Sequence, residues 1–207
     1  AQEGGDEPFG ITGVGAFTTP ALADADGDGD LDLFIGNFNG NSLFFRNTAA
    51  SGATSPAYAQ EGGDEPFGIA GVDVWASPAL ADADGDGDLD LFIGESDGNI
   101  LFLRNTAPPG ATSPAYAAAF TNPFEITDVG TFASPAFADA DNDGDLDLFI
   151  GNSDGNTVFF RNTAATPVAP VQSTTADGSY GIGSVINLTV SFSEPVVVDT
   201  TGLSLIH

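Results

Sequence analysis

Short apolar blocks recur along the chain and alternate with turns rich in glycine, asparagine and aspartate. One block reads LDLFIG at 31–36, 89–94 and 146–151, and a second apolar block follows each copy at 43–45, 101–103 and 158–160. Adjacent apolar residues within short runs predict strands that are buried on both faces. The turns between paired blocks carry the dipeptides Asn39-Gly40, Asp97-Gly98 and Asp154-Gly155. Such dipeptides accept positive φ, so they predict two-residue hairpins.

Two further strands complete each predicted sheet. SPALADAD, at Ser77–Asp84 and its equivalents, alternates alanine with larger residues and predicts a crowded inner strand. The more polar PFGIAGV, at Pro66–Val72, is the candidate for a fourth strand. With 27 glycines and 13 prolines, helices are hard to place anywhere. The predicted fold class is all-β.

The blocks belong to a long internal repeat. Asp24 and Asp82 are 58 residues apart, and Asp82 and Asp139 are 57 apart. Such a period indicates supersecondary units that bury their faces on their neighbours. The predicted organisation is three repeats at 1–58, 59–116 and 117–163, a linker at 164–174, and a different β segment at 175–207.

Strands that are apolar on both faces predict that each small sheet is sandwiched between the sheets before and after it. Face-to-face stacking of four-stranded sheets builds a β-propeller, which usually needs about 4 to 8 blades to close. Three blades do not close a ring. The sequence therefore leaves three arrangements open: further repeats outside this sequence, association of copies, or an open linear stack.

Each repeat carries a run of aspartates on alternate positions, with glycine at position 6. Oxygen donors at this spacing around a sharp glycine turn are typical of a Ca²⁺ loop, so we expect about three calcium ions, one per repeat. Magnesium fits less well because it seldom uses a dedicated carboxylate cage, and an acidic turn without metal is the alternative. The candidate ligands are Asp24, Asp26, Asp28, Asp30 and Asp32, then Asp82, Asp84, Asp86, Asp88 and Asp90, and then Asp139, Asp141, Asp143, Asp145 and Asp147.

Position by position, the loops differ from an EF-hand. Position 12 is Ile35 or an equivalent isoleucine, where an EF-hand needs a bidentate glutamate. Position 9, Asp32 in the first run, is therefore expected to close the coordination shell. Position 7, Asp30 in the first run, is expected to contribute its backbone carbonyl and to point its side chain outward.

Charge and composition exclude several functions. The formal net charge is -27, with 30 acids against three arginines and no lysine, so nucleic acid and anionic membranes are very poor partners. No apolar run approaches the roughly 18 residues of a membrane-spanning helix. With no cysteine and a single His207, the usual catalytic triads lack members, and a carboxylate pair such as Glu61 and Glu65 is the remaining option. We expect no enzymatic activity.

Two recurrent residue types have structural interpretations. The arginines Arg46, Arg104 and Arg161 occupy one equivalent place, and we expect them to pair with carboxylates or carbonyls. Trp75 replaces a phenylalanine of the other repeats, and it is expected to belong to the core.

The motif PALADADGDGDLDLFIG, followed by a hairpin and FLRNT, resembles the FG-GAP and VCBS-type repeats. Those repeats are propeller blades with a D-x-D-x-D-G-x-x-D calcium loop, also seen in integrin α-chain propellers. The resemblance covers residues 1–163 and implies calcium-bound blades of a secreted or cell-surface protein. The segment 175–207 resembles the opening of bacterial Ig-like modules.

Together these observations favour a calcium-stabilised scaffold or adhesive segment of a secreted or surface-attached bacterial protein, such as an extracellular fibre subunit. The alternatives are a carbohydrate- or protein-binding propeller and a non-catalytic accessory module of a polysaccharide-active enzyme. Expected partners are other copies of the chain, further repeats of a longer parent chain, glycans or surface proteins.

Overall fold

The computed structural model describes residues 5, 7–50, 53–69, 72–108, 111–127 and 129–163, together with the backbone of 172–173 and 188–189. The chain divides into two compact units. The first comprises residues 1–140 and 146–161 and contains three antiparallel sheets; the second comprises 141–145 and 162–207 and contains one short strand pair.

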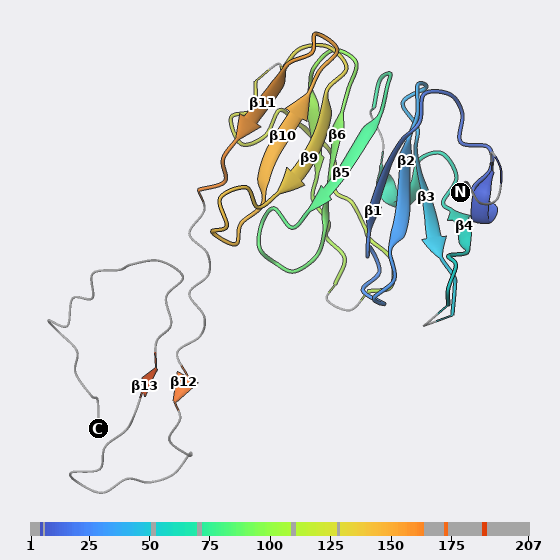
Figure 1. The fold of residues 1–207 in the computed structure, drawn as a ribbon, viewed down its shortest axis with the longest axis horizontal. Coiled ribbons are helices and arrows are strands. Elements are labelled where there is room, and N and C mark those ends of the chain that lie inside the picture. Colours follow the sequence, from blue (N-terminus) through green and yellow to red (C-terminus); the bar gives the residue numbers. More distant parts are fainter. Residues whose placement is uncertain are drawn as a thin grey trace, which may run out of the picture. The chain divides into compact units, whose positions relative to one another are not determined.

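The strands follow the repeat (Figure 1). The first sheet contains β1 (Thr19–Ala23), β2 (Asp32–Gly36), β3 (Ser42–Asn47) and β4 (Tyr58–Glu61). The second contains β5 (Ser77–Ala81), β6 (Asp90–Gly94), β7 (Ile100–Leu103) and β8 (Phe120–Thr121). The third contains β9 (Ser134–Ala138), β10 (Asp147–Gly151) and β11 (Thr157–Phe160). The described helical elements are single 3₁₀ turns, η1 (Pro8–Gly10) and η2 (Pro66–Gly68), so the all-β prediction is confirmed.

The prediction for the fourth strand was wrong. Pro66–Gly68 forms η2, in which Phe67 has a φ of 56°, and neither a proline nor a left-handed residue continues an extended ladder. The fourth strand of the first sheet is Tyr58–Glu61, which pairs with β3 through Phe44 and Glu61 at one end.

The predicted two-residue hairpins are also wrong. β2 ends at Gly36 and β3 begins at Ser42, which leaves a loop of residues 37–41. Gly40 has a φ of 84°, whereas Asn39 is not among the residues with positive φ, and a two-residue type I′ turn needs both. Instead, the side chain of Asn37 accepts hydrogen bonds from the N–H groups of Asn39 and Asn41 at 2.9 and 3.2 Å.

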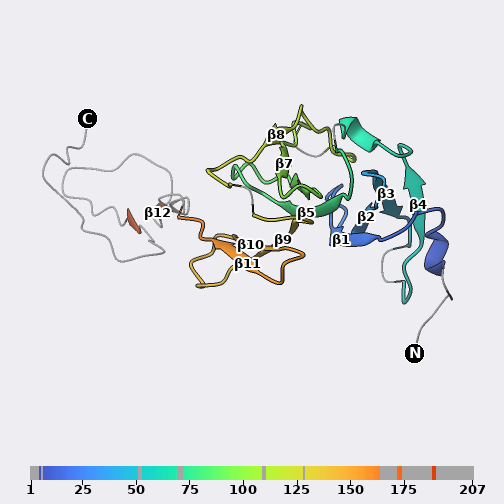
Figure 2. The ribbon, with the colours of Figure 1, turned by 90° about the horizontal axis from the view of Figure 1, so that it is seen from above.

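The sheets stack face to face, so that β5 lies between β1 and β9 (Figures 1 and 2). Phe34 and Phe44 of the first sheet pack in one cluster with Leu91 and Ile93 of the second. On the other face of β6, Phe92 packs with Ile150 of the third sheet. The prediction that strands apolar on both faces form a sandwiched sheet is confirmed for the middle sheet.

The first sheet is covered differently on its outer side. Leu33, Leu43 and Phe45 are buried there against Ile11 and Val14, which precede β1 in the chain. A segment of the same repeat therefore covers β2 and β3 on the side where no described sheet lies.

The predicted Ig-like module at 175–207 lies outside the described residues, except for the backbone of β13 (Leu188–Thr189). That strand pairs with β12 (Gln172–Ser173) in an antiparallel arrangement.

Candidate metal centre

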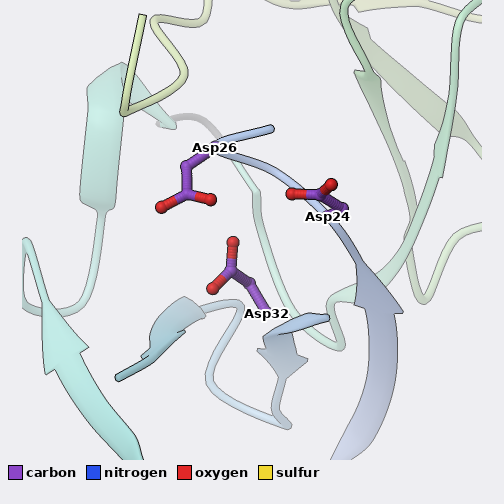
Figure 3. Close-up of side chains that lie close together, drawn as sticks. All are labelled: Asp24, Asp26 and Asp32. Carbon is purple, nitrogen blue, oxygen red and sulfur yellow. The ribbon is translucent and has the colours of Figure 1, made fainter. Parts of the chain in front are cut away.

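The first aspartate run forms the loop between β1 and β2, and Asp32 is the first residue of β2. One carboxylate oxygen from each of Asp24, Asp26 and Asp32 lies within 4.8 Å of the other two. Figure 3 shows these three side chains pointing toward a common space. Asp32 is buried and the other two are half-buried, so this group is shielded from bulk water on one side.

The carboxylate of Asp24 organises the turn of the loop. Its Oδ1 accepts hydrogen bonds from the backbone N–H groups of Gly27 and Asp28 at 2.8 and 3.1 Å, and its Oδ2 accepts one from Gly29 at 3.0 Å. Gly29 has a φ of 92°, a conformation that strongly favours glycine. The second loop repeats this pattern around Asp82. The glycine at position 6 therefore correctly predicted a sharp turn in the loop.

The other two loops bring together different members of the run. The groups there are Asp82, Asp84 and Asp86, and Asp139, Asp141 and Asp143, with the same 4.8 Å limit between ligand atoms. Within the described residues, the three groups leave out position 7, which is Asp30, Asp88 and Asp145, and in the second and third loops also position 9, Asp90 and Asp147. Asp28 is likewise outside the first group.

The position 9 aspartate has a second role that the sequence did not indicate. Asp90 is 1% exposed; its Oδ1 accepts a hydrogen bond from the N–H of Asn105 at 2.8 Å and its Oδ2 one from the N–H of Ala83 at 3.1 Å. Asp32 makes the same pair of bonds with Asn47 and Ala25. This side chain therefore joins the start of the loop to the end of the hairpin.

Burial raises the pKa of Asp32 and of Asp90 above the ordinary value of an aspartate. The backbone N–H donors oppose this shift, and neighbouring aspartates, Asp26 beside Asp32 and Asp84 beside Asp90, add to it. A cation bound nearby would stabilise the ionised form of both side chains.

Arg46 and Arg104 pair with carboxylates, as predicted, and these pairs neutralise part of the loop charge. Arg46 contacts Asp26, and its Nε and Nη2 atoms donate to the two carboxylate oxygens of Glu61 at 2.8 and 3.1 Å. Arg104, which is half exposed, pairs with Asp84 and Asp86 in the second loop. Glu61, considered above as one member of a catalytic pair, is thus the ion-pair partner of Arg46.

The donor set fits calcium. The grouped atoms are all carboxylate oxygens, which hard cations prefer. Two ligands on opposite sides of a calcium ion lie at most about 5 Å apart, because each Ca–O distance is about 2.3–2.6 Å. The grouped oxygens lie within 4.8 Å of one another, so one ion can reach all three. Asp24, Asp26 and Asp32 would hold the ion in the first loop.

Trp75 does not belong to the buried core predicted for it. It is half-buried in a row of aromatic side chains, with ring centroids 6.0 Å from Phe17 and 5.1 Å from Phe132. Phe17 is 68% exposed. The three residues have φ values of 52°, 64° and 56°, so the backbone holds these rings at the surface in a left-handed conformation.

Comparison with known proteins agrees with the repeat and its loops. The sequence profile described as FG-GAP-like repeat matches residues 24–93 and again 82–150, which together cover well over half of the chain. The chain belongs to the FG-GAP-like repeat family. A search of the curated proteins finds no match. None of the described residues lies in a helix with the length and apolar character that a membrane crossing requires.

Proposed function

We propose that this FG-GAP-like repeat chain is a calcium-stabilised structural or adhesive scaffold of a secreted or cell-surface protein, with one ion in each aspartate loop. The convergence of Asp24, Asp26 and Asp32 on one space is the observation that carries this proposal. Without a cation the grouped carboxylates repel one another, and a bound cation would replace that repulsion with attraction between the loop and the first residue of β2. Ion binding is enough to explain the arrangement of the repeated loops, and we propose a non-catalytic role.

The test is thermal unfolding of the full chain by circular dichroism, in millimolar calcium and in excess chelator. Because calcium would bind the folded loops and not the unfolded chain, each site should add about 2.7 kcal/mol at a calcium concentration 100-fold above its Kd. Calorimetry on the chelated sample should then find about three ions per chain. Equal melting temperatures in the two conditions would contradict the proposal.

The aromatic row favours a second candidate, a binding propeller or accessory module. Phe17, Phe38, Trp75 and Phe132 line a hollow of about 540 Å³, and exposed aromatic rings are common anchors for ligands. A glycan array read in calcium tests this candidate, with Trp75→Ala as the variant that should lose binding. If no glycan on the array binds, a protein ligand is the remaining possibility for this second candidate function.

A further inference from the structure

The middle sheet buries both of its faces, whereas each outer sheet leaves part of one face exposed. Four of the five residues of β5 are buried. In β1, Pro20 and Leu22 are exposed, and in β9, Ser134, Ala136 and Ala138 are exposed. We call the face of a sheet that packs on the next repeat its forward face and the opposite one its rear face. The first sheet is open on its rear face at β1, although residues of the same repeat cover β2 and β3 there. The third sheet is open on its forward face, and among the described residues no strand covers either opening.

A pair of phenylalanines shows what the forward side of a sheet requires. Phe92 and Phe102 face each other across β6 and β7 with centroids 4.9 Å apart, and they are only 2% and 8% exposed because the third repeat packs on them. The equivalent pair on the third sheet, Phe149 and Phe159, has the same geometry with centroids 4.8 Å apart. Phe159 is nevertheless 42% exposed.

Backbone hydrogen bonds define how one repeat docks on the next. The N–H of Ala133 donates to the carbonyl of Glu95 at 3.0 Å, and the N–H of Phe132 donates to the carbonyl of Ser96 at 3.1 Å. The first and second repeats make the same two contacts. Asn152 is the third repeat's equivalent of Glu95, and it lies with Gly151 and Ser153 in the lining of the 540 Å³ hollow.

A strand-end glycine marks the same contact. A Cβ atom on Gly94 would lie 2.2 Å from the carbonyl oxygen of Ala133, and one on Gly36 would lie 2.0 Å from that of Ala76. The next repeat therefore approaches too closely for any side chain. At Gly151 the nearest such atom is 4.0 Å away, so the space used by the next repeat elsewhere is open here.

The rear side of the first repeat exposes the complementary residues. Thr18 and Pro20 are exposed, whereas Ala133 and Pro135, at the same places in the third repeat, are buried.

Leu22 is 57% exposed. Its equivalent, Phe137, packs on Phe92 of the preceding repeat with a centroid distance of 4.8 Å.

We propose that the forward face of the third sheet binds the rear face of the first repeat of a second copy of this chain. The contact would reproduce the one between consecutive repeats: Leu22 of one copy packs on Phe149 of the other, and the N–H of Thr18 donates to the carbonyl of Asn152. This inference rests on the scaffold function proposed above and adds its partner. Such a head-to-tail contact gives a closed ring or an open filament, depending on the rotation per copy.

Sedimentation of the full chain in calcium over a wide concentration range tests this inference. The wild-type chain should associate, and Gly151→Val should weaken association roughly tenfold or more, because it fills the docking space. The substitution has room in the single chain. Thr18→Ala, which restores the alanine found at 76 and 133, should strengthen association.

Phe159→Ser and Phe120→Ser form a matched pair. Both residues are exposed, at 42% and 62%, but Phe120 lies on β8 of the second sheet, away from the proposed contact. We expect the first variant to weaken association and the second to leave it unchanged.

A monomer at all concentrations, or association that Gly151→Val does not change, would overturn the inference. The face would then be left for another occupant, such as a further repeat of a longer chain. Melting the same samples with and without chelator separates the two proposals: a calcium shift without association overturns only this inference, whereas the absence of a shift overturns the calcium proposal.

Discussion

The Oδ1 atom of Asp90 accepts a 2.8 Å hydrogen bond from the backbone N–H of Asn105. This bond ties the first residue of β6 to the chain just beyond β7 and, with the second bond to Ala83, uses both carboxylate oxygens. Asp90 therefore holds the loop and the hairpin together whether or not a cation is bound.

Asp90→Asn should lower the free energy of unfolding by about 1–3 kcal/mol even in chelator, because its amide nitrogen would face a backbone donor. Asp84→Asn is the matched control. Asp84 is exposed and pairs with the half-exposed Arg104, so this variant should cost under about 1 kcal/mol in chelator while reducing the calcium-induced rise in melting temperature. Equal losses of unfolding free energy for the two variants in chelator would contradict the separate roles of Asp90 and Asp84.

Arg46 is expected to compete with calcium for Asp26. Its guanidinium contacts Asp26 and forks onto Glu61, so a bound ion would lie near a positive charge. Arg46→Gln should raise the calcium affinity of one site by about fivefold, a change of about 1 kcal/mol, and should lower stability in chelator because Glu61 loses its partner.

Calorimetry at constant ionic strength measures the affinity change at Arg46. Arg104→Gln provides the comparison, since the Arg104 side chain is 52% exposed and its charge is more strongly screened. Its effect should be smaller. An Arg46→Gln chain with wild-type affinity at every site would show that the ion does not approach this arginine.

Glu95 carries a buried charge that the other repeats avoid. It is 6% exposed and stands where they have Asn37 and Asn152. Burial raises the pKa of Glu95, with a smaller opposing effect from the N–H of Asp73. Since the folded pKa lies above the unfolded value, the ionised form destabilises the fold at neutral pH. That cost is relieved as the pH falls through the folded pKa toward 4.5.

Glu95→Gln keeps the acceptor for Asp73 and removes the charge. It should raise the melting temperature at pH 7 by about 2–4 °C for each kcal/mol gained, and the gain should shrink near pH 4.5. Asp97→Asn, at the exposed tip of the same hairpin, should change little. A gain independent of pH would show that charge is not the cause.

The strand-end glycines predict an asymmetry between repeats. Gly94→Ala should destabilise the chain by about 1–3 kcal/mol because the added Cβ collides with the carbonyl of Ala133. The same change at Gly151 should stay within about 0.5 kcal/mol. Chemical unfolding of the two variants at low protein concentration makes the comparison, and equal losses would contradict the observed inter-repeat contact.

Most of each sheet and every aspartate loop could be predicted from local pattern. The LDLFIG blocks became β2, β6 and β10, and the glycine at position 6 does turn the loop. The fourth strand could not be predicted, because Tyr58–Glu61 and Pro66–Val72 are both short and weakly patterned. Only pairing with β3 distinguishes them. Arg46 pairs with Glu61 and Asp90 with Asn105, in each case with a residue 15 positions further along the chain. The local sequence pattern does not specify which residues of two neighbouring strands stand opposite each other at that separation.

The repeat, the all-β class and the places where carboxylates gather follow from the order of residues alone, because period, turn residues and charge are properties of neighbouring positions. Which faces of the sheets are covered depends instead on how the repeats pack in the folded chain. Phe102 and Phe159 stand at the same place in their repeats, yet one is 8% exposed and the other 42%. The difference arises because burial depends on what packs against a residue, and a third sheet covers only the first of these two side chains.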